Sequence, residues 1–151
     1  MLAIGQVAPD FELTDEDGEQ ITLEGLLSGE SLILYFYPAD FTPLCTAEAC
    51  SIRDMHDDIV DVGVKVVGIS PQGDQSHQRF KSQFNIPFPL LFDKSKKVIR
   101  AYGVDGPFGM GVRRVTYLIG KDKTITNRVA SDLFIGSHTQ FIKQVIADHH
   151  Q

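Results

Sequence analysis

The chain contains two cysteines, Cys45 and Cys50, and both lie in one short segment. Thr42 and Pro43 precede Cys45, and they predict the start of a helix, because Thr is a favoured N-cap and Pro fits the first helical position. Cys45 then becomes the third helical residue. Free backbone N–H groups and the positive end of the helix dipole favour a thiolate there, so the pattern predicts a nucleophilic thiol at Cys45.

The five-residue spacing between Cys45 and Cys50 constrains what they can do together. In an unbroken α-helix their Cα atoms would be roughly 8–9 Å apart, whereas a disulfide tolerates at most about 7 Å. A disulfide therefore requires the first turns of the helix to unwind, and helix ends open at low cost. Two alternatives are that the thiols are small buried hydrophobes or metal ligands. With His56 and His77 as the nearest histidines, the spacing matches no usual zinc site, so we expect no bound metal.

The segment resembles the active-site signature of a known family. Pro38-x-x-x-Thr42-x-x-Cys45 is similar to the signature of the peroxiredoxins. The continuation Cys45-Thr-x-Glu48-Ala-Cys50 resembles the bacterioferritin-comigratory-protein, or Q-type, subfamily. Further matching segments run along nearly the whole chain, at 8–11, 68–71, 88–93, 101–104 and 114–119.

The resemblance implies a role for several residues. Cys45 would be the peroxidatic cysteine, whose thiolate attacks the O–O bond of a hydroperoxide and becomes a sulfenic acid. Thr42 would contact the sulfur and the peroxide oxygen through its hydroxyl, and Pro38 would shield the site from water. Arg114, on a distant strand, would hold the thiolate and the peroxide. Such a donor suits the reaction, because negative charge develops on the leaving oxygen.

Two neighbouring residues are less determined by the sequence. Arg113 is adjacent to Arg114, but alternate residues of a strand face opposite ways, so we expect Arg114 to be the one in the site. Glu48 is expected to orient Arg114 from the helix. The alternative is an ordinary solvated carboxylate in the first turns of a helix.

The resemblance also assigns a role to the second cysteine. Cys50 would be the resolving cysteine, which condenses with the sulfenic acid to give an intramolecular disulfide and water. Thioredoxin or a similar dithiol protein would reduce that disulfide, and no cofactor is expected. One-cysteine turnover with an external thiol stays open as an alternative. The expected substrates are hydrogen peroxide and organic hydroperoxides.

The elements that position these residues follow from periodicity and turn signals. Strands are predicted at 11–13, 21–23, 31–37, 64–69, 90–92, 115–119 and 125–129, and helices at 43–62, 75–84, 94–102 and 137–148. Strands that alternate with helices, followed by a hairpin and a last helix, indicate an α/β fold. With the resemblance, we expect a thioredoxin-like fold whose central mixed sheet is flanked by helices and begins with a β-hairpin.

Length, charge and the N-terminal sequence limit the remaining possibilities. The 151 residues, of which 42% are apolar, predict a single domain over 1–151. A net charge of −6 argues against a nucleic-acid surface. The N-terminus lacks the pattern of a signal peptide and no segment has the length and apolarity of a membrane span, so we expect a cytoplasmic protein without a membrane partner. We expect a monomer or a weak dimer.

Two other functions use the same residues. A thiol–disulfide oxidoreductase of this fold would be expected to carry Cys-x-x-Cys and a proline before the strand that faces it, but segment 111–119 contains no proline and offers Arg114. A redox sensor or holdase would use the unwinding of the helix to expose a binding surface. Sustained consumption of peroxide distinguishes the enzyme from the sensor.

Overall fold

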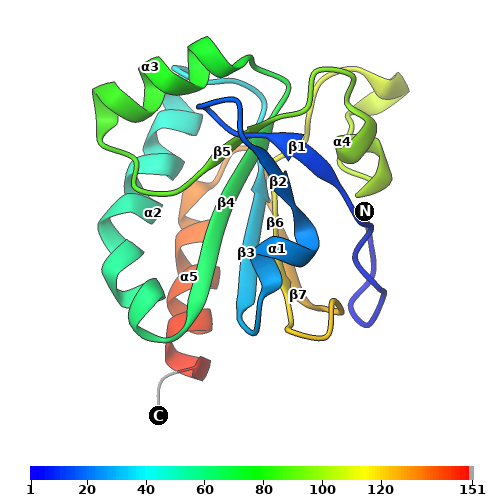
Figure 1. The fold of residues 1–151 in the computed structure, drawn as a ribbon, viewed down its shortest axis with the longest axis vertical. Coiled ribbons are helices and arrows are strands. Elements are labelled where there is room, and N and C mark those ends of the chain that lie inside the picture. The colour runs from blue at the N-terminus through cyan, green and yellow to red at the C-terminus, as the bar shows by residue number, and fades with distance from the viewer. Residues whose placement is uncertain (150–151) are drawn as a thin grey trace.

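A computed structural model describes residues 1–149 of the chain, and a seven-stranded sheet forms its centre (Figure 1). The strands are β1 (Glu12–Thr14), β2 (Gln20–Thr22), β3 (Ser31–Phe36), β4 (Val64–Ser70), β5 (Leu90–Phe92), β6 (Val115–Ile119) and β7 (Ile125–Ala130). The helices are α1 (Leu23–Leu27), α2 (Pro43–Asp61), α3 (Asp74–Phe84), α4 (Lys97–Ala101), the short 3-10 helix η1 (Pro107–Gly109) and α5 (Ile135–His149). In the described part of the chain, no helix is long and apolar enough to cross a membrane.

The sheet has the strand order β2-β1-β5-β4-β3-β6-β7. The three central strands β3, β4 and β5 are parallel, and β6 and β7 continue the sheet in antiparallel fashion beside β3. At the other edge, β1 and β2 form an antiparallel hairpin. The predicted mixed sheet flanked by helices, with an N-terminal hairpin, is therefore confirmed.

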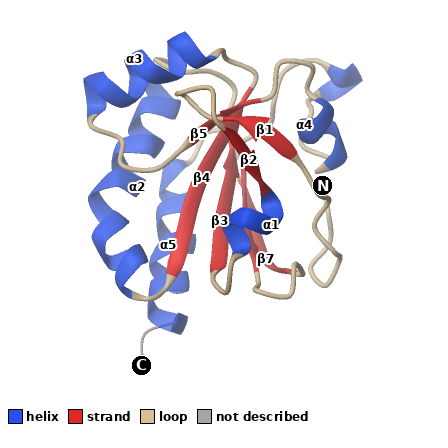
Figure 2. Cartoon of the chain, viewed as in Figure 1, coloured by secondary structure: helices blue, strands red, loops and turns tan. Residues whose placement is uncertain are grey.

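Alternate residues of β3 point into two separate hydrophobic cores, as the pleat of a strand requires. Leu32, Leu34 and Phe36 face the core that α1 and α4 cover. Ile33 and Tyr35 face the core on the opposite side, which α2, α3 and α5 cover (Figure 2). The buried residues of α2 recur at helical spacing, and they are Cys45, Glu48, Ala49, Ile52 and Ile59. The cysteine predicted to be reactive thus belongs to the side of the sheet that α2 covers.

The predicted secondary structure is wrong in two regions. One is the end of the N-terminal hairpin, and the other is the loop before β6. A strand was expected over 21–23, but Leu23 begins α1, because the Thr22 hydroxyl accepts a hydrogen bond from the backbone N–H of Gly25 at 3.1 Å and caps this helix. The sequence predicts neither α1 nor η1. Helices this short carry little periodicity for a sequence to reveal.

The helix predicted over 94–102 is shorter than expected. It begins at Lys97, because the residues before it form a turn in which Lys96 has a φ of 61°. The buried Asp93 carboxylate accepts a hydrogen bond from the N–H of Ile99 at 2.8 Å and so stabilises the start of α4. All the other predicted helix and strand ends lie within two residues of the observed ones.

Replacing Gly68 with Ala tests the packing behind α2. Gly68 pairs with Tyr35 across β3 and β4, and a Cβ atom at Gly68 would lie 2.8–2.9 Å from atoms of the buried Tyr35 side chain. We expect Gly68→Ala to lower the free energy of unfolding by about 1–3 kcal/mol, the range for overpacked cores. Chemical denaturation measures it. Gly136→Ala is the control, since nothing lies within 4 Å of a Cβ there, and an unchanged stability of Gly68→Ala would contradict the close packing.

Candidate active site

Cys45 lies at the third position of α2, where the sequence analysis placed it, and only 2% of it is exposed. Thr42 is the N-cap by backbone conformation, and Pro43 follows as the first helical residue. The Thr42 hydroxyl does not cap the helix. It donates to the carbonyl oxygen of Ala39 at 3.0 Å, so the hydrogen bond it makes in this structure points back into the loop rather than to Cys45.

The Arg114 guanidinium joins two groups of α2. Nη2 donates to Cys45 Sγ at 3.3 Å, and Nη1 donates to Glu48 Oε1 at 2.8 Å. The sheet explains this placement. Val115 pairs with Phe36, so Arg114 lies beyond the last residue of β3, beside the loop that leads into α2. Its Nε donates to the carbonyl oxygen of Asp132 at 3.4 Å, so Arg114, which is 4% exposed, is a buried cation with three polar partners.

Arg113 points elsewhere, as the alternation of strand residues predicts. Its Nη2 lies 3.4 Å from Oδ2 of Asp132, and both side chains are about half exposed. Asp132 also supports Arg114, because its Oδ1 accepts a hydrogen bond from the Arg114 backbone N–H at 2.9 Å. The sequence analysis missed Asp132, which follows β7 and carries no local signal.

Glu48 is a buried carboxylate rather than the solvated one considered as an alternative, since only 1% of it is exposed. Burial raises its pKa to about 7, against the opposing effect of the Arg114 charge and hydrogen bond. Oε1 is bonded to Arg114, whereas Oε2 has no hydrogen-bond partner among the described residues. The imidazole Nδ1 of His138, on α5, lies 3.5 Å from Oε2. The sequence analysis missed His138 as well.

Both cysteines are free thiols, and α2 runs without a break through Cys45 and Cys50. Cys50 is partly exposed. An unbroken helix places Cα atoms five residues apart at roughly 8–9 Å, beyond the reach of a disulfide. The structure is therefore that of a reduced form with an intact helix.

The loop before α2 is anchored by a buried polar cluster. The Asp40 carboxylate accepts hydrogen bonds from the Tyr37 hydroxyl at 2.7 Å and from Ser76 Oγ at 2.8 Å. Nδ1 of the buried His77 lies 2.7 Å from Oδ2 of the same carboxylate. Phe41 follows with a φ of 66°. These contacts fix the loop to α3, and the sequence analysis found none of them.

A cavity of about 630 Å³ opens beside the buried groups. Pro38 and Arg114 line it together with Asp132 and the loop that contains Met110. Pro38 and Arg114 thus border the same cavity. Its lining combines the exposed Met110 with charged residues, among them Asp105 and Arg113.

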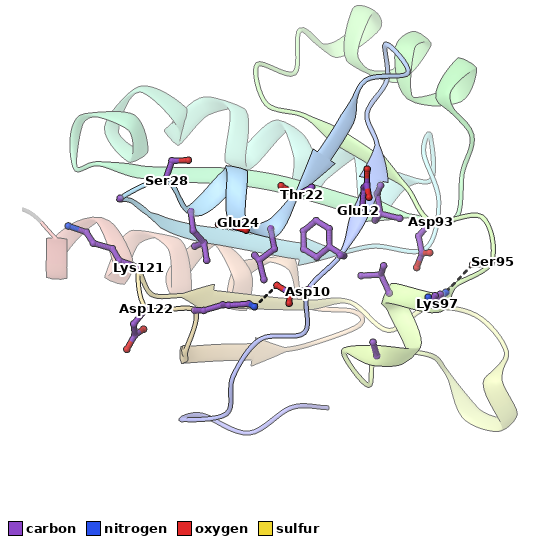
Figure 3. Close-up of a pocket in the computed structure, with 18 residues that line it drawn as sticks. Asp10, Glu12, Thr22, Glu24, Ser28, Asp93, Ser95, Lys97, Lys121 and Asp122 are labelled. Carbon is purple, nitrogen blue, oxygen red and sulfur yellow. Dashed lines mark hydrogen bonds and ion pairs between the residues drawn. The ribbon is translucent and has the colours of Figure 1, made fainter.

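A larger groove of about 1110 Å³ lies on the other side of the sheet and is shown in Figure 3. Its apolar lining belongs to the core that α1 and α4 cover, and charged residues such as Glu12, Glu24 and Lys97 surround it. Asp10 and Lys123, which both line it, form an ion pair. None of the predicted site residues lines this groove. The candidate site is therefore not the largest groove, because Cys45 belongs to the core on the opposite side of the sheet.

Comparison with known proteins identifies the family of the chain. A model of the AhpC/TSA family matches residues 4–128. Peroxiredoxin Bcp of Bacillus subtilis is 41% identical over 127 residues, which cover 80% of this chain and 80% of that protein. The chloroplastic peroxiredoxin Q of Arabidopsis thaliana is 38% identical over 144 residues, which cover 92% of this chain and 66% of that protein.

Solved structures agree with the fold. The structure of peroxidoxin BcpB from Mycobacterium tuberculosis matches with a TM-score of 0.92 and 30% identity over 100% of both chains. Peroxiredoxin Q of Xanthomonas campestris matches with a TM-score of 0.84 and 26% identity, over 93% of this chain and 92% of that one. The predicted thioredoxin-like fold is thus confirmed. The chain belongs to the AhpC/TSA family as a peroxiredoxin of the Bcp and Q group, and it is an enzyme that acts as a thiol peroxidase.

Proposed function

We propose that the protein reduces hydrogen peroxide and organic hydroperoxides through a sulfenic acid on Cys45. The observation that carries this proposal is the buried Cys45 Sγ at the start of α2, 3.3 Å from Nη2 of Arg114. The thiolate attacks one oxygen of the hydroperoxide, an S–O bond forms and the O–O bond breaks. The sulfur is oxidised, and the leaving oxygen takes up a proton as water or an alcohol.

The neighbouring residues have separate parts in this step. Arg114 stabilises the thiolate and the charge that develops on the leaving oxygen, because a guanidinium keeps its charge and offers several donors in a fixed geometry. Glu48 orients Arg114 through the 2.8 Å hydrogen bond. Pro38 limits water at the cavity. Thr42 turns its hydroxyl from Ala39 toward the sulfur and the peroxide when substrate binds.

Cys50 completes the cycle. Its thiol attacks the sulfur of the Cys45 sulfenic acid, an S–S bond forms and water leaves. The start of α2 unwinds to bring the two sulfurs together. Thioredoxin or a similar dithiol protein then reduces the disulfide and returns both thiols. No observation favours the sensor or the thiol–disulfide oxidoreductase over this cycle.

Replacement of each cysteine by serine tests the assignment. With thioredoxin, its reductase and peroxide, we expect Cys45→Ser to consume no peroxide, because only Cys45 has the helix start and the Arg114 partner. Cys50→Ser should retain one rapid oxidation of Cys45 but form no intramolecular disulfide. Steady-state peroxide consumption and rapid thiol-oxidation kinetics measure the two steps. Equal reactivity of the two thiols, or oxidation of the wild type without turnover, would contradict the proposal.

The two adjacent arginines provide a matched pair. We expect Arg114→Ala to lower the second-order rate constant for hydrogen peroxide by about a hundredfold or more, the usual effect of removing one donor from a developing oxyanion. Arg113→Ala should change it little, since that side chain binds Asp132 at the surface. Stopped-flow oxidation of Cys45 gives both constants. A larger effect of Arg113→Ala would show that Arg113, and not Arg114, stabilises the developing charge.

Amide hydrogen exchange tests the conformational step. In the disulfide form we expect lost protection over 46–53 of α2 and unchanged protection of β4, because the unbroken helix holds the cysteines too far apart to bond. The reduced protein is the reference. Mass spectrometry must first establish the intramolecular disulfide. If that form protects α2 as well as the reduced form does, the cycle does not involve unwinding.

A further inference from the structure

We propose that His138, on α5, is a positioning residue that shares one proton with the Glu48 carboxyl group. Through Glu48 it controls how firmly the Arg114 guanidinium is held to Cys45 Sγ. The effect on catalysis rests on the proposed function, whereas the sharing of the proton does not.

The hydrogen bonds of His138 fix which ring nitrogen carries a proton. Only 1% of His138 is exposed, and its Nε2 lies 2.9 Å from the carbonyl oxygen of Ser131. A carbonyl oxygen only accepts, so Nε2 is the donor. In the neutral ring Nδ1 is then an acceptor. It faces two oxygen atoms, the Thr116 hydroxyl at 2.8 Å and Glu48 Oε2 at 3.5 Å.

When Glu48 is ionised, the Thr116 hydroxyl donates to Nδ1 of the neutral ring, whereas the charged Oε2, 3.5 Å from that nitrogen, has no donor among the described residues. A buried polar atom without a partner is costly. One proton taken from solvent and carried by Oε2 or by Nδ1 allows a hydrogen bond between Glu48 and His138, and the Thr116 hydroxyl, whose hydrogen can rotate, then turns away from Nδ1.

The charges in the site also favour the state in which Glu48 and His138 hold one additional proton. With a Cys45 thiolate, an ionised Glu48 and Arg114, the buried groups sum to one negative charge, and the shared proton neutralises it. Burial raises the pKa of Glu48 to about 7. Burial also lowers the pKa of His138, as does the Arg114 charge, while the Ser131 carbonyl and Asp132 oppose that shift. The carboxyl group therefore holds the proton, and the imidazole accepts its hydrogen bond.

The other charged and titratable groups around the pair come from the neighbouring elements. Arg114, beside β6, keeps its charge, and Asp132 follows β7 at the surface side of Arg114. Tyr35, on β3, is fully buried with an unbonded hydroxyl, and burial raises its pKa well above 10, with Glu48 and Cys45 adding to the shift. The remaining titratable neighbour is the Cys45 thiol itself.

The shared proton changes the electrostatics at the sulfur. While it is bound, Arg114 directs its charge mainly toward Cys45. As the pH rises through the titration of the pair, Glu48 gains a full negative charge, competes for Arg114 and repels the thiolate. The rate of Cys45 oxidation is therefore expected to carry a step near neutral pH, with the lower rate on the alkaline side.

His138→Asn tests this by kinetics. An Asn amide near the position of Nδ1 can donate to Oε2 without titrating, so Glu48 ionises at lower pH. We expect the step in the pH–rate profile to move to lower pH and the rate at neutral pH to fall by about tenfold, which corresponds to one pK unit of lost stabilisation. Thr139→Val is the control, because it removes a different α2–α5 contact, the 2.8 Å hydrogen bond with Ser51. It should keep the wild-type profile. A step that stays in place in His138→Asn would overturn the proposal.

Nitrogen NMR of His138 in the reduced protein, without peroxide, gives an independent measurement. We expect the Nδ1 chemical shift of the wild type to change near neutral pH and this change to disappear in Glu48→Gln. A change that persists in Glu48→Gln, or is absent from the wild type, would overturn the shared proton. If the coupled titration is found but neither the wild type nor any variant reduces peroxide, the shared proton is supported and the proposed function alone fails.

Discussion

The guanidinium of Arg114 links two secondary-structure elements that are distant in the sequence. It comes from the residue before β6, and it donates to Cys45 and Glu48, which both belong to α2. Buried ionised groups cost several kcal/mol each unless they are paired and hydrogen-bonded. A cation between two acidic groups meets that condition, and it also ties α2 to the sheet. The antiparallel pairing of β6 with β3 is what brings the cation to the right end of the sheet.

The parts of the site that depend on local sequence were predictable. The apolar run of β3, the Thr42-Pro43 helix start and the position of Cys45 all follow from signals within a few residues of one another. The choice of Arg114 came from the resemblance to the family, and the alternation of strand residues then predicted that Arg113 faces the other way. The spacing between Glu48 and Cys45 does not predict whether the Glu48 carboxylate is buried, because a carboxylate at that position of a helix can equally well face solvent.

The parts that depend on packing between distant elements were not predictable from one sequence. His138 reaches Glu48 because α5 packs on α2, and Asp40 meets His77 because α3 covers the loop before α2. No periodicity within α5 or α3 distinguishes these histidines from any others. The Thr42 hydroxyl differs from its expected direction for a local reason: the carbonyl of Ala39, in the same loop, accepts its proton.

The anchored loop before α2 sets a limit on movement in the site. Asp40 stays bound to α3 through Ser76 and His77, and Phe41 packs against Phe80 of the same helix with ring centroids 5.3 Å apart. If this attachment survives when α2 opens, the chain from Phe41 to Cys45 acts as a tether of four Cα–Cα steps. An extended chain spans at most about 3.3–3.6 Å per residue, so the Cys45 Cα can travel no farther than roughly 14 Å from that of Phe41. A tether this short confines the sulfur to the neighbourhood of its own helix, which keeps Cys50 within reach and the thiols of other molecules at a disadvantage.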